Sequence, residues 1–248
     1  MLPQTHIDGT PIATANTPDG SLAYGSDTAA HSAFTSRDTA PSNLLRYRVI
    51  KRAGDILILL LAIPVLLPVI FLIGCIVRFK SPGPVFFSHR RVCHNGAFFS
   101  MWKFRTMCVN STEVLDRYLK EHPEAQAEWS RCHKLQDDPR ITAFGLFLRR
   151  SSLDELPQAW NVLTGSMSLV GPRPIVAGEV EKYGEYFRDY CRVKPGITGL
   201  WQVSGRSKLT YERRVQLDSE YVARWSLTRD FKILLTTCKS VVNKDGAY

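Results

Sequence analysis

Two adjacent carboxylates, Asp154 and Glu155, stand in the stretch "SSLDELPQAWNVLTGSMSLVGPRP", which closes on an arginine between two prolines, Arg173. An ionised aspartate is a carboxylate nucleophile. A neighbouring glutamate suits a hard cation, because Mg²⁺ takes one or two carboxylates together with substrate phosphates. Arginine binds phosphate oxygens through two parallel N–H donors, and Arg149 and Arg150 precede the acids. These residue types predict phosphoryl chemistry.

The same two acids also fit a purely structural role. Ser152 and Glu155 have the S-x-x-E spacing of a capping box, and Asp154 would be the N-cap of a helix that begins nearer Pro157. Either start leaves both carboxylates at a helix N-terminus, where the dipole favours their ionised form. Spacing alone leaves capping and catalysis open.

The charge of the chain is unevenly distributed. The net charge is +9 over 248 residues, yet the first 45 residues carry one Arg and four Asp, so residues 46–248 carry +12. Such a basic segment indicates an anionic partner: a phosphate-bearing substrate, an acidic lipid or nucleic acid. The six cysteines lack zinc spacing. No groove-reading or base-stacking module is recognisable, so we expect no nucleic acid among the partners.

A run of 22 residues without a charge, 56–77, predicts insertion into a membrane. Pro64 and Pro68 lie inside it, and each removes a backbone hydrogen bond and bends a helix. Both flanks are basic, which favours the cytoplasmic side for both ends. A re-entrant helix–break–helix in one leaflet satisfies both observations, and Asp55 is expected to pair with a flanking Arg or Lys. The alternative is a kinked helix that crosses the membrane.

Three segments follow from these patterns. Residues 1–45 are rich in small and polar residues without hydrophobic periodicity, so we expect a disordered tail. Residues 46–80 form the membrane-inserted segment. Residues 81–248 combine β-type runs, such as "FFSMWKFRTM", with several helical stretches, which predicts an α+β, mostly helical catalytic domain with a short β element. The last helical stretch, "DFKILLTTCKSVV", is basic and amphipathic, typical of an interfacial helix or of a core-facing terminal helix.

The chain resembles the bacterial sugar transferase family, the monotopic polyprenyl-phosphate phosphoglycosyl transferases. Three blocks carry the resemblance, in this order: "KFRTM" at 103–107, "DPRITAFGLFLRRSSLDELPQAWNVLTGSMSLVGPRP" at 138–174 and "VKPGITGLWQVSGR" at 193–206. The final "GAY" is similar to the ending of hexose-specific members. The resemblance covers the chain from Lys51 to Tyr248, and the tail lies outside it.

The resemblance implies an activity and a location. Members transfer hexose-1-phosphate from a UDP-sugar to undecaprenyl phosphate and release UMP, and this branch suggests galactose or glucose. The resemblance implies that Asp154 forms a covalent phospho-sugar intermediate and that Glu155 binds a Mg²⁺ ion. It implies the first membrane step of exopolysaccharide, O-antigen or capsule synthesis, at the bacterial inner (cytoplasmic) membrane, with the catalytic domain facing the cytoplasm.

The basic residues of the matching blocks are expected near phosphates or the nucleotide. They are Lys103, Arg105, Arg150, Arg173, Lys194 and Arg206. The family's hydrophobic segment breaks at a Ser-Pro pair that is Leu67-Pro68 here, so Pro64 is expected to supply part of the kink. The alternative function is a catalytically silent, membrane-anchored assembly component. The sequence does not identify the hexose or the oligomeric state, and a homo-oligomer is one of the states that it allows.

Overall fold

The computed structural model describes residues 43–132, 134–205 and 208–242. Helices predominate within this part, and its strands form two separate two-stranded sheets. The expected α+β, mostly helical class is confirmed. The tail predicted for residues 1–45 lies almost wholly outside the described residues.

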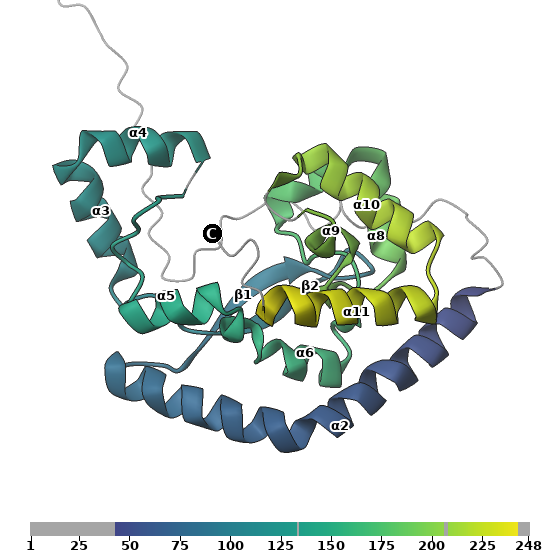
Figure 1. Cartoon of the computed structure of the whole chain (residues 1–248). Helices are drawn as coiled ribbons and strands as arrows, with labels where there is room; N and C mark the ends of the chain where they lie inside the picture. Colours follow the sequence, from purple (N-terminus) through teal and green to yellow (C-terminus); the bar gives the residue numbers. More distant parts are fainter. Residues whose placement is uncertain (1–42, 133, 206–207, 243–248) are drawn as a thin grey trace, which may run out of the picture.

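One long helix, α2 (Asn43–Lys80), runs beneath the rest of the molecule (Figure 1). The sequence predicts a break at Pro64 or Pro68, but the helix continues through both prolines and curves around the domain. The two prolines are four residues apart, on the same exposed side of the helix. Each removes one bond from the helical ladder, and their bends add in one direction. The structure therefore has one curved helix where a two-helix hairpin is expected.

Buried polar contacts fasten the first turns of α2 to the domain. The Nζ atom of Lys51 lies 3.4 Å from Asp55 Oδ1 and 2.8 Å from Oδ2 of Asp230, on α11 (Leu227–Val242). Asp55 Oδ1 also accepts a hydrogen bond of 3.2 Å from the main-chain N–H of Leu169. The predicted pairing of Asp55 with a flanking cation is confirmed. Since all three charged groups are buried, the loss of Lys51 would leave two buried carboxylates without a cation.

The β1–β2 hairpin is the short β element expected from the sequence. Strand β1 (Phe86–Val92) pairs antiparallel with β2 (Phe98–Phe104). The register sets Arg91 opposite Phe99 and Lys103 opposite Phe87. Because cross-strand partners share a face and alternate residues repeat it, Arg91 and Lys103 project from the same face of the hairpin.

A second small sheet joins two turns of the chain by close backbone approach. Strand β3 (Ser168–Val170) runs parallel to β4 (Gly196–Thr198). Beyond the strands, the Gly171 N–H donates to Thr198 O at 2.9 Å, and the Gly196 N–H donates to Pro172 O at 2.8 Å. A Cβ at Gly171 or Gly196 would collide with the facing backbone, so only glycine fits there. The turn that carries Arg173 is thereby fixed to the segment before α9 (Leu200–Val203).

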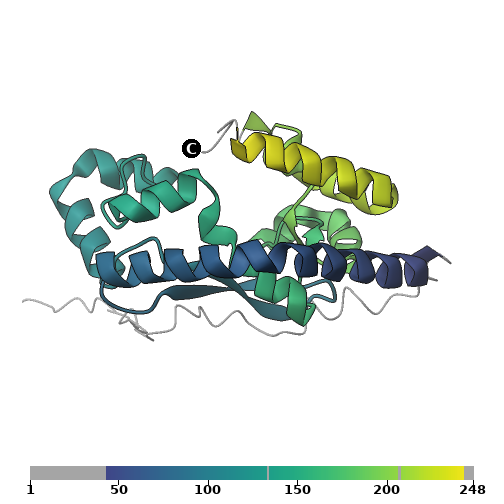
Figure 2. The ribbon, with the colours of Figure 1, turned by 60° about the horizontal axis from the view of Figure 1, so that its bottom comes forward.

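The remaining elements surround this centre. Helices α3 and α4 project to one side (Figures 1 and 2). Helices α5 and α6 pack on α2, whereas α10 packs on α8 and α9, and α11 on α9 and the β3–β4 sheet. The bounds of the remaining elements are α3 (Ser111–Glu121), α4 (Pro123–Cys132), α5 (Ala143–Arg150), η1 (Leu153–Glu155), α6 (Gln158–Thr164), η2 (Ala177–Glu179), α7 (Val180–Tyr183), η3 (Gly184–Tyr186), α8 (Phe187–Arg192) and α10 (Tyr211–Ala223).

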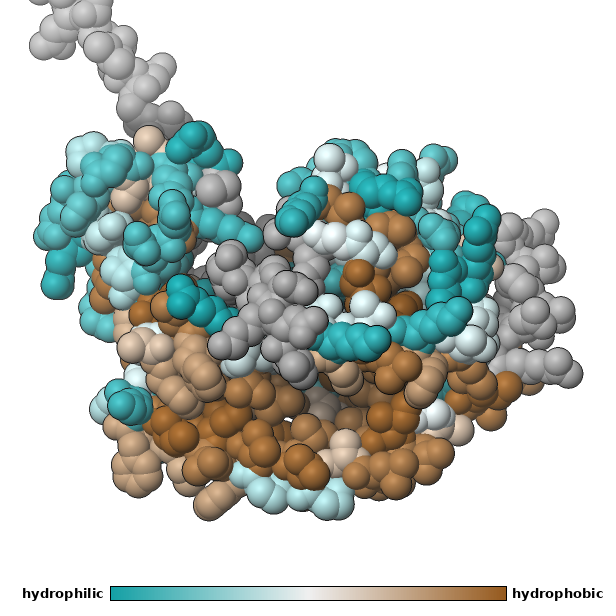
Figure 3. All heavy atoms as spheres, viewed as in Figure 1, coloured by the Kyte–Doolittle hydropathy of each residue, from teal (hydrophilic) through white to brown (hydrophobic). Residues whose placement is uncertain are grey.

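The outer side of α2 is a broad apolar surface. Figure 3 shows hydrophobic residues gathered along the edge of the molecule where α2 lies. By length and composition the segment Arg48–Lys80 is able to cross a membrane, and only 11% of its most apolar window is buried in the molecule. Soluble monomers rarely expose so large a contiguous apolar surface. In α11, Ile233 packs into the core while Phe231 and Leu235 stay exposed beside Lys232 and Lys239, so the helix packs on the core and its exposed face is partly apolar and basic.

Candidate functional site

Asp154 and Glu155 lie on η1, a single turn between α5 and α6. Ser152, just before it, has a left-handed φ of 56°, which redirects the chain after α5. Neither η1 nor α6 has a side-chain cap hydrogen bond, and α6 begins at Gln158 after Pro157 as its N-cap. The capping alternative is therefore wrong, and the acids are free for another role.

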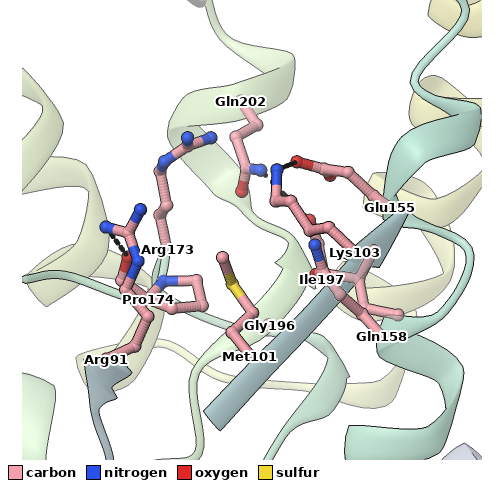
Figure 4. Close-up of a pocket in the computed structure, with 10 residues that line it drawn as sticks. All are labelled: Arg91, Met101, Lys103, Glu155, Gln158, Arg173, Pro174, Gly196, Ile197 and Gln202. Carbon is pink, nitrogen blue, oxygen red and sulfur yellow. Dashed lines mark hydrogen bonds and ion pairs between the residues drawn. The ribbon is translucent and has the colours of Figure 1, made fainter. Parts of the chain in front are cut away.

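Lys103 holds the acid pair from the neighbouring strand. Its Nζ lies 2.7 Å from Glu155 Oε1 and 3.5 Å from Asp154 Oδ2, and Figure 4 shows it reaching the glutamate across the pocket. Burial tends to raise the pKa of Glu155, but the charges of Lys103, Arg173 and Arg91 outweigh it and hold that pKa below its usual range. Glu155 is therefore ionised near neutral pH.

The pKa of Asp154 is shifted in the opposite direction to that of Glu155. Burial raises the pKa of its carboxyl, Lys103 lowers it, Glu155 raises it and Arg149 lowers it, and the net shift is upward. The sequence predicts that a helix dipole keeps Asp154 ionised, but the residue sits on a three-residue turn and not at the start of a long helix. Its charge depends on the neighbouring cations instead.

Two arginines line the same pocket as Glu155. Arg173 enters from the turn after β3, and Arg91 enters from β1 and donates from Nη1 to Pro174 O at 3.3 Å (Figure 4). Burial and the nearby Arg173 lower the pKa of Arg91, because two guanidinium groups repel when no anion lies between them. The residues that line the pocket are Arg91, Met101, Lys103, Glu155, Gln158, Arg173, Pro174, Gly196, Ile197 and Gln202.

Four of the predicted residues meet in this place, and Arg105 does not. Lys103, Glu155 and Arg173 line the pocket, and Asp154 lies beside it with its Oδ2 3.5 Å from Lys103 Nζ. They come from two of the three matching blocks of the sequence. Arg105 instead donates from its side chain to the carbonyl of Ser81, just after α2. It lies beyond the end of β2, where the strand alternation that aims Lys103 at the acids no longer holds. The structure gives Arg105 an anchoring contact away from the pocket.

The structure places Arg149 near the acids, and not Arg150 as expected. Arg150 is exposed in the last turn of α5 and does not line the pocket. Arg149 turns inward, donates from Nε to Thr106 Oγ1 at 2.9 Å, and lowers the pKa of Asp154. Adjacent residues on a helix point about 100° apart, so only one arginine of the pair can face the acids.

Lys194 also lies outside the pocket. Its ammonium group lies beside Gly165, at the end of α6, near the guanidinium of Arg52. Arg52 caps this helix end by donating to the carbonyls of Val162 and, at 2.7 Å, Leu163. Arg206, the remaining predicted residue, lies outside the described residues.

Sequence reasoning missed Arg91, Gln158 and Gln202 as lining residues. The signal for Arg91 was the hairpin register, which places it on the face of Lys103. Gln158 and Gln202 lie in matching blocks of which only the charged residues were expected at the site. Gln202 Nε2 donates to Ile197 O at 3.1 Å, which holds its amide beside the pocket wall.

The two adjacent carboxylates fit a metal site that is completed by water and by a phosphate ligand. Among residues 43–132, 134–205 and 208–242 there is no group of three or more His, Cys, Asp or Glu side chains able to hold a metal ion. Asp154 and Glu155 remain as adjacent carboxylates. Mg²⁺ usually takes one or two carboxylates and completes its shell with water and substrate phosphates. The pair therefore fits a Mg²⁺ ion that binds together with a phosphate ligand.

Known relatives match nearly the whole described chain. The family model "Bacterial sugar transferase" matches residues 46–244. An undecaprenyl-phosphate galactose phosphotransferase of Salmonella typhimurium is 48% identical over 205 residues, which are 81% of this chain and 42% of that protein. The exopolysaccharide production protein ExoY of Sinorhizobium fredii is 46% identical over 198 residues, 80% of this chain and 88% of the relative. An Escherichia coli protein, UDP-glucose:undecaprenyl-phosphate glucose-1-phosphate transferase, is 42% identical over 206 residues, 79% of this chain and 41% of the relative.

The chain thus spans most of ExoY but less than half of the Salmonella and Escherichia proteins. The matched residues include α2, the hairpin, the acid pair and the turn of Arg173. With a family match of this extent, the chain belongs to the bacterial sugar transferases.

Proposed function

We propose that this protein transfers hexose-1-phosphate, from UDP-galactose or UDP-glucose, to undecaprenyl phosphate and releases UMP. The observation that carries the proposal is the carboxylate pair held by Lys103 at the edge of a pocket that Glu155, Arg91 and Arg173 line. Phosphoryl transfer needs an anionic nucleophile and cations that bind the phosphate groups. The printed names of the Salmonella and Escherichia relatives support the same reaction class.

The acid pair suggests a two-step route. A carboxylate oxygen of Asp154 attacks the phosphorus that bears the sugar, and the bond from that phosphorus to the bridging oxygen breaks. UMP leaves with the bonding electrons, and an aspartyl phospho-hexose remains. A phosphate oxygen of the lipid then attacks the same phosphorus and releases the carboxylate. No proton has to move in either step, because both nucleophiles are already anions.

The surrounding side chains stabilise charge along this route. Arg91 and Arg173 bind non-bridging oxygens of the diphosphate and the charge that develops on UMP. Lys103 lowers the pKa of Asp154 against the effect of burial, which favours the anionic nucleophile. Glu155, with Asp154 beside it, would hold Mg²⁺, which supplies positive charge to the diphosphate when it is bound.

The attachment of α2 supports a one-sided place at the inner membrane. Lys51, near the N-terminal end, pairs with Asp230, and Ile73 and Val77, near the other end, pack with Phe104 in one core cluster. The hydrocarbon core of a bilayer is about 30 Å thick, so a crossing helix would carry its ends to opposite sides. Because both ends of α2 contact one domain, we propose that α2 dips its apolar outer side into the cytoplasmic leaflet. Its basic flanks agree with this orientation.

Measurement of UMP release tests the function directly. Purified protein in lipid nanodiscs with undecaprenyl phosphate and Mg²⁺ is supplied in turn with UDP-galactose, UDP-glucose and UDP-N-acetylated sugars. We expect UMP and a lipid-linked hexose phosphate from one of the two hexoses. If none of the nucleotide sugars yields UMP above the level of the Asp154→Asn variant, the protein is the silent assembly component instead.

A further inference from the structure

Two basic side chains meet at the C-terminal end of α6, the end opposite the acid pair. The guanidinium of Arg52 donates to Val162 O and, at 2.7 Å, to Leu163 O. A Cβ on Gly165 would lie 3.7 Å from Arg52 Nη2 and 3.3 Å from Lys194 Nζ. The two cations therefore flank one space, which the glycine leaves open.

Arg48 adds a third cation on the same side of α2. It is exposed and lies four residues before Arg52, so the two arginines share a face of the helix. Burial and Arg52 lower the pKa of Lys194, Cys93 and Asp55 raise it and Arg48 lowers it, and the net shift is downward. Arg48, Arg52 and Lys194 are called the basic cluster below.

A structural role for the basic cluster accounts for only part of its charge. The C-terminal end of a helix carries about half a negative charge, and Arg52 already contacts its carbonyls. Among residues 43–132, 134–205 and 208–242, neither Arg48 nor Lys194 has a hydrogen-bond or ion-pair partner. The nearby carboxylate of Asp55 already lies 3.4 Å from Lys51 Nζ. The surplus of positive charge favours an anionic ligand.

An apolar groove begins at the basic cluster and follows α2. Its volume is about 570 Å³, and it is lined by Arg48 and Arg52 at one end and farther along by Val49, Ile56, Leu57 and Leu60. From residue 48 to residue 60 a helix rises about 18 Å, and the hydrocarbon of one leaflet is about 15 Å thick. A cationic end and an apolar length match the phosphate and an acyl chain of a phospholipid.

An exposed tryptophan indicates the depth of this region in the membrane. Helix α6 packs on α2, and the two lie side by side in both views (Figures 1 and 2). Trp160 on α6 is 61% exposed. Tryptophan is enriched at the headgroup level of bilayers, where lipid phosphates lie. The basic cluster is on the same short helix end and would reach those phosphates.

We propose that the basic cluster and the groove bind one anionic phospholipid of the cytoplasmic leaflet, with its phosphate beside Lys194, Arg48 and Arg52 and one acyl chain along α2. The bound phosphate relieves the repulsion among the three cations. The inference rests on the proposed position of α2 in the leaflet and not on the transfer reaction. The site is separate from the pocket of the acid pair, because the length of α6, about 10 Å, lies between them.

Native mass spectrometry of the detergent-purified protein tests the site. The protein is titrated with phosphatidylglycerol or with phosphatidylcholine of the same acyl chains, and the Kd comes from the fraction with one lipid bound. We expect tighter binding of phosphatidylglycerol. Arg48→Gln and Lys194→Gln should each weaken it about five-fold, the effect of one basic residue near an anionic lipid surface, and leave phosphatidylcholine binding unchanged. Lys194→Arg keeps the charge and should keep most of the affinity.

Matched controls remove the same charges elsewhere. Arg117→Gln and Lys120→Gln alter exposed residues of α3, which projects away from α2 (Figure 1), and should leave both Kd values unchanged. Arg52 is not substituted, because its contacts with α6 would make a loss of stability hard to separate from a loss of binding. Arg48 is exposed and makes no such contacts, so Arg48→Gln decides the question even if Lys194→Gln fails to fold.

Two competitors identify the occupant. Millimolar inorganic phosphate should not displace phosphatidylglycerol, because it lacks the acyl chain. Undecaprenyl phosphate should bind the Arg48→Gln variant as tightly as the unmodified protein, because we place its phosphate in the pocket of the acid pair.

Equal affinity for the two phospholipids, losses in Arg48→Gln no larger than in the controls, or displacement by inorganic or undecaprenyl phosphate would each overturn the proposal. The failure of the proposed function looks different. In that case no nucleotide sugar yields UMP, whereas phospholipid binding is measured without any turnover.

Discussion

Lys51 and Asp230 form a 2.8 Å ion pair that is shielded from solvent and joins the first turns of α2 to α11. Asp55 shares the same ammonium group. The apolar helix is thus joined to the domain by charge as well as by packing.

The substitution Lys51→Met should destabilise the protein strongly, because it leaves Asp55 and Asp230 buried without a cation. Removal of one partner of a buried pair costs about 3–5 kcal/mol. Chemical denaturation in detergent micelles measures the loss. The variant Lys51→Met combined with Asp230→Asn should recover part of it, and the exposed Lys232→Met is the control. A loss no larger than that of the control would show that the pair contributes little.

Removal of Lys103 should shift the acid limb of the pH–rate profile. Asp154 acts as an anion, so kcat/KM falls as the pH drops through its pKa, which burial has already raised. Lys103 lowers this pKa, so Lys103→Met should raise it and move the limb to higher pH, besides lowering the maximum rate. The profile of kcat/KM between pH 5 and 9 is the measurement. An acid limb that stays in place would separate Lys103 from the ionisation of Asp154.

The variant Asp154→Asn should fold and be inactive. An amide cannot displace UMP and retain the phospho-sugar. After incubation with the UDP-sugar and no lipid acceptor, mass spectrometry of the unmodified protein should find one added hexose phosphate on the peptide that contains Asp154. The Asn variant should gain nothing and keep its Tm. Turnover above a few per cent of the unmodified rate, with deamidation excluded, would contradict the covalent route.

Chelation of divalent cations should stop turnover, and Mg²⁺ should restore it. Glu155→Gln should lower activity by at least about 100-fold, since a neutral amide is a poor ligand for a hard cation. Mutation of residues that only support metal ligands already costs up to about 100-fold. Glu185→Gln, on an exposed residue, serves as the control. Full activity in EDTA would remove the ion from the mechanism.

Both ends of the chain should lie on the cytoplasmic side. Single cysteines placed in the tail and at the C-terminus of a cysteine-free variant should resist an impermeant thiol reagent added to intact cells and react after lysis. Labelling of the tail alone in intact cells would establish a membrane-crossing α2.

The acid pair and Arg173 could be predicted because they lie in a compact block whose residue types suffice to suggest a phosphate site. Lys103 was expected only from the family resemblance. Arg105 and Lys194 also belong to matching blocks, yet they lie away from the pocket, because their direction depends on where β2 ends and where α6 packs. Arg91 required the hairpin register, which depends on the turn between the strands.

The prolines of α2 show a similar limit. The residue type indicates a weakened helix, but whether a helix breaks or curves depends on what supports it. Here the side opposite the prolines packs on the domain along most of its length (Figure 2), and that support outweighs the two lost hydrogen bonds.

The inner side of α2 supplies Leu59, Ile73 and Val77 to the core, while its outer side carries exposed residues such as Leu61 and Phe71. The helix is therefore both the proposed membrane anchor and one wall of the domain, and these two roles cannot be separated by cutting the chain. A fragment that begins after Lys80 would expose the surfaces that these side chains cover, and would aggregate instead of giving a water-soluble enzyme. Solubilisation of this protein thus calls for substitutions on the outer side of α2 and not for its deletion.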